Sequence, residues 1–117
     1  MSEDSKLQIH ESLSGESAQS RWRKAINSAE KCFQEVKFLA AGMAVHHHYN
    51  PETAMIAARY NFGRARNISG KICLQKVFDN QAVLLEIEFE TEEDNKERLE
   101  MFFDESGLVL HAAIGTA

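Results

Sequence analysis

The sequence has no long apolar run and few of the residues on which compact motifs depend. None of its hydrophobic stretches approaches the roughly 18 residues that a membrane-spanning helix needs, so we expect no membrane span. Its six glycines are scattered and match neither a GxGxxG nor a GxxxxGK spacing, which excludes a phosphate-binding loop of either type. The first residues are polar and acidic and lack an apolar h-region, which favours a chain without a signal peptide and a cytoplasmic location.

Cysteine is equally scarce. Cys32 and Cys73 are far apart in the sequence, and neither lies at ligand spacing from another cysteine or from a histidine. In a chain that is not secreted, we expect both to be buried thiols rather than a disulfide. No HExxH or CxxC pattern is present, so the sequence predicts no metal and no cofactor.

The charges divide along the chain, although the net charge is only −5. Residues 21–76 carry ten Lys and Arg against three acids, whereas residues 77–117 carry two against eleven. Either the two segments neutralise each other in the fold, or one charged face meets a partner of opposite sign. Because nucleic-acid binders usually present a basic domain, this acidic chain is not expected to bind nucleic acid.

The strongest local pattern is a helical stripe in the N-terminal half. Its apolar residues follow one another at spacings of four and three, which predicts one helix over residues 17–47, about 45 Å long. Ser17, or Ser14 with Glu16 in the first turn, is expected to cap its start. Such a stripe is longer than a small sheet covers, so we expect a homodimer through the long helix or the sheet. The stripe consists of Trp22, Ile26, Ala29, Phe33, Val36, Ala40 and Met43.

Three adjacent histidines, His46, His47 and His48, precede the start of a second helix. Asn50 suits an N-cap and Pro51 the first helical position, so this helix is predicted over about 51–65.

Consecutive side chains on a helix point in different directions, so the three histidines cannot all face one ion. Three roles stay open. His47 continues the apolar stripe, with its neighbours near a helix C-terminus; or two of the histidines form part of a zinc site with a distant ligand such as His111; or they act in catalysis or pH sensing.

From Ser69 onward the period of the pattern changes to two, which predicts four antiparallel strands with short connections. Glu86, Glu88 and Glu90 line one face of the second strand, either as a solvated face or as an acidic docking surface. "KLQIH" near the N-terminus is a weaker strand pattern. The residues expected to point inward are Ile72, Leu74, Phe78, Val83, Leu85, Ile87, Phe89, Leu99, Met101, Phe103, Leu108, Leu110, Ala112 and Ile114, with His111 on the opposite face.

These patterns predict an α+β fold with one long and one shorter N-terminal helix packed on a four-stranded antiparallel meander. A single domain is expected over residues 17–117, after a flexible arm over residues 1–16. The order of helices followed by a curved meander resembles, in outline, the cone of the nuclear transport factor 2-like superfamily. That resemblance implies a pocket between helix and sheet, which serves small-molecule enzymes as well as non-enzymatic dimers, and it transfers no site residue.

Two functions follow from these expectations. The first is a small non-enzymatic binding, adaptor or inhibitor protein that acts as a homodimer through a charged or apolar surface, with another protein as its partner. The second is a pocket protein or enzyme whose cavity is lined by Tyr49, Tyr60, Phe62 and Phe103, with His47 or His111 as a base. The candidate binding residues are His46, His47, His48, Tyr49, Tyr60, Phe62 and His111.

Overall fold

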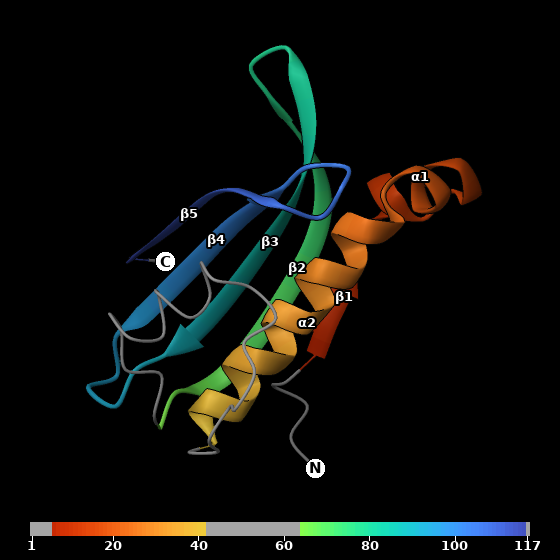
Figure 1. The fold of residues 1–117 in the computed structure, drawn as a ribbon. Helices are drawn as coiled ribbons and strands as arrows, with labels where there is room; N and C mark the ends of the chain where they lie inside the picture. Colours follow the sequence, from red (N-terminus) through yellow and green to blue (C-terminus); the bar gives the residue numbers. More distant parts are fainter. Residues whose placement is uncertain (1–5, 42–63, 117) are drawn as a thin grey trace.

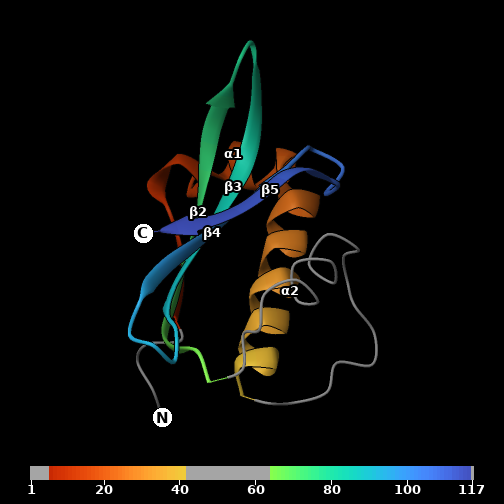
Figure 2. The ribbon, with the colours of Figure 1, turned by 90° about the vertical axis from the view of Figure 1, so that its left-hand side faces the viewer.

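The computed structural model describes residues 6–41 and 64–116. The strands of this part form a single sheet in the order β1-β2-β3-β4-β5, and α2 lies along one face of it (Figures 1 and 2). The α+β class agrees with the sequence prediction. The elements are β1 (Lys6–Ile9), the 3₁₀ turn η1 (Glu11–Leu13), α1 (Glu16–Arg21), α2 (Arg23–Ala40), β2 (Arg66–Val77), β3 (Asn80–Glu90), β4 (Lys96–Phe103) and β5 (Val109–Thr116).

The sheet is mixed and five-stranded, so the prediction of four antiparallel strands is wrong. Strands β2 to β5 do form the predicted antiparallel meander. However, β1 pairs in parallel with β2, with Leu7 opposite Gly70. The segment expected to be an arm therefore contributes a strand, and Leu13 just after it is fully buried. The "KLQIH" pattern signals a strand, but the pairing joins residues some 60 positions apart, which a local pattern does not reveal.

The helix predicted over residues 17–47 is broken at Trp22, whose φ of −102° and ψ of 16° lie outside the helical region. The two helices α1 and α2 meet there at an angle (Figure 1). Gly15 takes the N-cap position of α1 without a side-chain hydrogen bond, so the capping expected from Ser14 or Ser17 is also wrong. The 18 residues of α2 span about 27 Å, and residues 42–47 lie outside the described residues.

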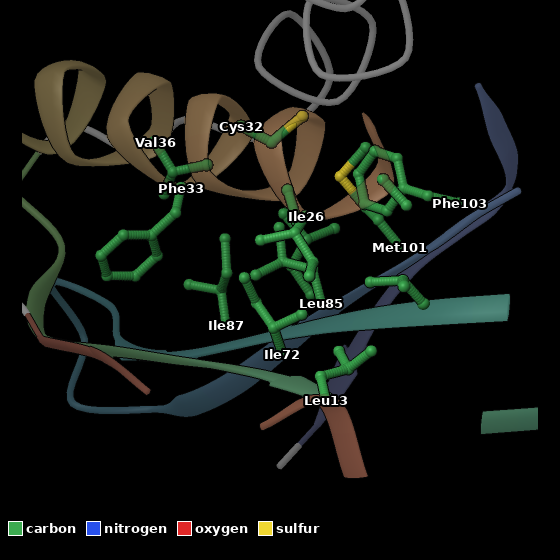
Figure 3. Packing of buried hydrophobic residues seen from close by; sticks show 14 of the residues in the cluster. Leu13, Ile26, Cys32, Phe33, Val36, Ile72, Leu85, Ile87, Met101 and Phe103 are labelled. Carbon is green, nitrogen blue, oxygen red and sulfur yellow. The ribbon is translucent and has the colours of Figure 1, made fainter. Parts of the chain in front are cut away.

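The apolar stripe of α2 is buried against the chain's own sheet. Figure 3 shows Ile26, Phe33 and Val36 above inward residues of the strands. The expectation of a homodimer rests on an apolar stripe longer than the sheet can cover. The sheet covers the described part of the stripe, so the length of the helix no longer supports a homodimer. The buried cluster comprises Leu13, Trp22, Ala25, Ile26, Ala29, Cys32, Phe33, Val36, Ile68, Ile72, Val83, Leu85, Ile87, Phe89, Leu99, Met101 and Phe103.

The period of two correctly predicts the inward residues of β3 and β4, but it fails at two places. Phe78 does not continue β2 and lies in the turn before β3. In β5, His111 pairs with Phe102 and Val109 pairs with Phe103, so Leu110 is the extra residue of a β-bulge. The bulge shifts the alternation by one residue, and for this reason Val109 packs toward the core while Leu108 and Leu110 are exposed.

A close approach between α2 and β2 holds the two layers together. A Cβ atom added to Gly70 would lie 2.7 Å from two ring atoms of Phe33 and 2.9 Å from a methyl group of Leu7. The ring of Phe33 therefore occupies the space that any larger residue at position 70 would need.

We predict that Gly70→Ala lowers the free energy of unfolding by about 1–3 kcal/mol, because the ring must move out of a packed core. Chemical denaturation measures the loss. Gly115→Ala is the matched control at a concentration where the chain is monomeric, since a Cβ atom there would have nothing within 4 Å of the same chain, and its change should stay within about 0.5 kcal/mol. Equal losses in both variants would contradict this account of the packing.

Candidate interaction surface

Most of the candidate binding residues lie outside the described residues: His46, His47, His48, Tyr49, Tyr60 and Phe62 all fall within 42–63. His111 is described, and it is exposed on the face of the sheet that points away from α2, with its ring centroid 6.2 Å from that of Phe102. Phe103 is fully buried beneath α2. The structure thus places His111 and Phe103 on opposite faces of the sheet and does not bring them together.

The described part of the chain carries surface hollows that are open to solvent, and two of them are candidates for binding. One, of about 210 Å³, lies over the sheet and is bounded by Asn67, Ser69, Glu88, Phe89, Glu90 and Lys96. The other, of about 300 Å³, runs along α2 beside Asn27, Glu30, Lys31 and Gln34. Neither hollow contains a histidine, and neither is an enclosed space between α2 and the sheet.

In residues 6–41 and 64–116, no three His, Cys, Asp or Glu side chains lie close enough together to hold a metal ion. Cys32 is buried and Cys73 is half-buried, and no disulfide joins them, so the expected burial holds for Cys32 and only in part for Cys73. Partial burial and the nearby Glu86 carboxylate raise the pKa of the Cys73 thiol, which therefore stays protonated at neutral pH. Within the same residues, no helix combines the length and the apolar character that crossing a membrane requires.

The glutamates of β3 are paired with cations on the outer face of the sheet. Arg98 lies between two of them, with its Nη2 atom 2.7 Å from Glu88 and its Nε atom 3.6 Å from Glu86. Lys71 approaches Glu86 from the other side at 3.9 Å. The hydrogen bond to Glu88 raises the pKa of Arg98. These ion pairs favour a solvated face with alternating charges over an acidic docking surface.

The ion pairs also explain the division of charge along the sequence. Arg21 donates to Glu105 at 2.9 Å, and Arg64 donates to Glu92 at 2.6 Å. Each of these contacts joins the basic segment 21–76 to the acidic segment 77–117. Arg66 does the same with Glu90 and Asp94, and so does Lys71 with Glu86. Of the two interpretations of the charge division, mutual neutralisation is the one that the structure favours.

The hairpin of β2 and β3 projects beyond the rest of the sheet (Figure 1), and an aromatic side chain forms its tip. Val77 pairs with Asn80, so Phe78 and Asp79 make a two-residue turn. Phe78 is 93% exposed and has a φ of 56°. A bulky residue with positive φ is an outlier, because glycine or asparagine normally takes this position in tight hairpin turns.

The turn between β4 and β5 lies at the same end of the sheet and is held firmly. One carboxylate oxygen of Asp104 accepts hydrogen bonds from the backbone N–H groups of Ser106 and Leu108, and from the Ser106 hydroxyl. These hydrogen bonds, the Ser106 hydroxyl foremost, hold the pKa of Asp104 below its ordinary value. Gly107, with a φ of 89°, lies against α2, where a Cβ atom would meet Ser28 at 2.6 Å.

This turn presents two further apolar side chains. Leu108 is 66% exposed and Leu110, at the bulge, is 57% exposed. Together with Phe78 they are the most exposed large apolar side chains among the described residues, and we call these three the apolar end. They do not form one continuous patch, because Phe103 at the end of β4 pairs with Val83, and Phe78 lies five residues beyond Val83 along the hairpin. Sequence reasoning missed them because it continued the strand alternation through a turn and a bulge. The only sequence signal is the "FDN" stretch, where a two-residue turn places the phenylalanine at the tip.

Comparison of the chain with protein-family models, with curated proteins and with solved structures finds no match. The resemblance in outline to the nuclear transport factor 2-like cone therefore stays an expectation. The function is argued below from the geometry of the described residues.

The hydrogen bonds of Asp104 predict a pH-dependent contribution to stability. A carboxyl whose pKa is lowered in the folded state stabilises the fold above its unfolded pKa, and this stabilisation is lost as the pH falls through the folded pKa. Asp104→Asn should therefore lower the free energy of unfolding at neutral pH by about 0.5–1 kcal/mol, a modest loss because solvent screens the charge. The difference from wild type should shrink as the pH falls below the ordinary range of a carboxyl pKa.

Urea denaturation at a series of pH values measures this difference. Glu93→Gln, which removes an exposed acid in the turn between β3 and β4, is the control and should show no comparable loss. A constant difference between wild type and Asp104→Asn at all pH values would refute the role of the charge.

Proposed function

We propose that this chain is a small non-enzymatic binding protein that acts as a homodimer and docks on another protein through its apolar end. The observation that carries the proposal is Phe78, an almost fully exposed aromatic side chain at the tip of a projecting hairpin, in a backbone conformation that its side chain disfavours.

Phe78 is unfavourable for the free energy of folding in two ways. Positive φ at a bulky residue costs of the order of 1–3 kcal/mol, and strain of this kind concentrates at functional positions. The exposed ring also forgoes the roughly 2–3 kcal/mol that burial of a phenylalanine side chain supplies. Glycine at position 78 would avoid both costs. A pocket on another protein would recover the second cost, and this is the reason to expect such a partner.

The chemistry of the hairpin favours an apolar protein pocket over a membrane surface. Residues 74–81 contain one cation, Lys76, and one acid, Asp79, so the tip lacks the basic cluster that attracts anionic lipids. Several cations of the basic segment are paired with acids of the acidic segment, which reduces the charge that could select a partner. Recognition is therefore expected to depend on shape and apolar contact.

The pocket function receives no support from the described residues. Phe103 is packed in the core and His111 lies on the outer face, while Tyr49, Tyr60, Phe62 and His47 fall within residues 42–63. Neither described hollow places a histidine next to a carboxylate.

If Phe78 is retained for binding rather than for folding, its replacement by glycine should stabilise the chain. We predict that Phe78→Gly raises the free energy of unfolding by about 1 kcal/mol, because glycine adopts positive φ at no steric cost. Thermal and chemical denaturation measure the change. Val77→Gly, at the half-buried end of β2, is the control and should lower stability. A loss of stability in Phe78→Gly would show that the ring is structural, and it would overturn the proposal.

The docking itself is tested by site-specific photo-crosslinking. A benzophenone amino acid placed at position 78 should form discrete adducts with one protein in an extract of the source cell. The same amino acid at position 93, which is exposed at the opposite end of the sheet, should form none of these adducts. Identical adducts at both positions, or adducts with lipid alone, would contradict a protein pocket as the binding site of the tip.

A further inference from the structure

The outer edge of β5 has no pairing partner among the described residues, since β5 is the last strand in the sheet. We propose that two copies of the chain join edge to edge through β5, in antiparallel pairing about a two-fold axis at Ala113. This inference rests on the homodimer of the proposed function and specifies its interface.

The composition of β5 points to pairing. Its eight residues, "VLHAAIGT", contain no acid, no lysine, no arginine and no proline. Exposed edge strands of monomers are usually protected by charged side chains, by proline or by being short, because a row of free N–H and C=O groups invites another strand. The opposite edge of the sheet, β1, is short, with four residues. Of the two edges in the described part of the chain, only β5 is long. Its bulge at Leu110 protects one end, and the residues beyond the bulge carry neither a lysine, an arginine, an acid nor a proline.

The alternation of side chains restricts how two β5 strands fit together. Cross-strand neighbours must lie on the same face, and the strand is regular only beyond the bulge at Leu110, over residues 111–116. An axis at Ala113 uses residues 111–115 of this segment, and an axis at Ile114 would use residues 112–116. The second axis would set the two Ile114 side chains directly opposite each other, so the first is the one proposed. An axis at Ala112 would bring the bulge residue of each copy into the ladder.

The same axis places large side chains opposite small ones. His111 lies opposite Gly115 of the second copy, and Ile114 lies opposite Ala112. A Cβ atom at Gly115 would have nothing within 4 Å, so there is room for the imidazole of the second copy on the outer face. On the inner face, Ile114 and Ala112 already pack against the core cluster and would extend it across the axis.

Electrostatic repulsion does not oppose this arrangement. The acid nearest to the axis is Glu100, which pairs with Ala113 within the sheet. Two copies of Glu100 would be three strand spacings apart, about 14 Å, which exceeds the screening length of about 8 Å at physiological salt.

Pairing of two β5 strands also gives a closed dimer, because it leaves no β5 edge free for a third copy. A two-fold interface uses the β5 edge of both copies and leaves only the short β1 strands at the ends of a ten-stranded sheet. The assembly should therefore stop at two copies and not grow into a fibre.

Cysteine crosslinking tests the register. Under mild oxidation, Ala113→Cys should form a disulfide-linked dimer, because the two copies of residue 113 face each other within the 4.4–6.8 Å Cα range, about one strand spacing, that a disulfide needs. His111→Cys should not, since its two copies would lie four residues apart along the strands, about 14 Å. The wild-type chain, with Cys32 and Cys73, controls for the native thiols. Crosslinking of His111→Cys but not Ala113→Cys would overturn the axis.

Light scattering across a concentration series tests the interface. The wild type should reach twice its 13.2 kDa at high micromolar concentration. Ala113→Lys sets two ammonium groups opposite each other and should weaken dimerisation at least tenfold, with an unchanged melting temperature at monomeric concentration. Gln75→Lys, which is also exposed but lies on the interior strand β2, should dimerise as the wild type does.

The outcomes separate the two proposals. A monomeric wild type at high concentration would remove the homodimer from the proposed function, and this interface with it. A dimer that Ala113→Lys leaves intact would overturn the β5 interface alone. Neither result bears on docking through Phe78, which the glycine variant and the photo-crosslinks decide.

Discussion

The distance between α2 and the sheet is the constraint on which the rest of the structure depends, and two glycines set it. At Gly70 the ring of Phe33 takes the place of a side chain on β2. At Gly107 the backbone of α2 does the same, because a Cβ atom there would lie 2.9 Å from the carbonyl oxygen of Lys24. One contact lies within β2 and the other in the turn before β5. These two contacts therefore hold α2 against the same face of the sheet at two separate places. Trp22, Ile26 and Val36 are then buried in the space between the layers.

Because α2 covers only one face of the sheet, the side chains on the other face must be compatible with contact with water. This explains why the glutamates of β3 alternate with its core residues and why Lys71 and Arg98 lie beside them. The same logic extends to the ends of the sheet. At the turn between β3 and β4, Arg64 and Arg66 pair with acids of the following segment. The charge division in the sequence thus agrees with the fold, in which acidic strands come to lie beside basic segments and several of their charges form ion pairs.

The sequence predicts those features that depend on neighbouring residues and misses those that depend on distant ones. The alternation in "AVLLEIEFE" identifies the inward face of β3 correctly, since both of its neighbours are antiparallel strands and the only irregularity in its pairing lies at the end of the ladder, between Arg66 and Ser69 of β2. The parallel pairing of β1 is decided by contacts with residues far along the chain.

The break at Trp22 leaves the spacing of apolar residues unchanged, so the helical pattern does not reveal it. The bulge at Leu110 shifts the alternation by one residue without any glycine or proline to mark it. Of the candidate site residues, only His111 can be placed, on the outer face as expected; the others fall within residues 42–63.

The two proposed contacts use different parts of the sheet, and their geometry suggests what they achieve together. Phe78 lies between β2 and β3, whereas the proposed dimer forms along β5, with β4 between them in the sheet order. Pairing through β5 would therefore leave both hairpin tips free. Antiparallel strands run in opposite directions across the axis, so the two tips would project from opposite ends of the ten-stranded sheet. Such a dimer cannot close both tips on a single compact partner. It would instead hold two partner molecules apart, which is the geometry of an adaptor rather than of an inhibitor that grips one target from two sides.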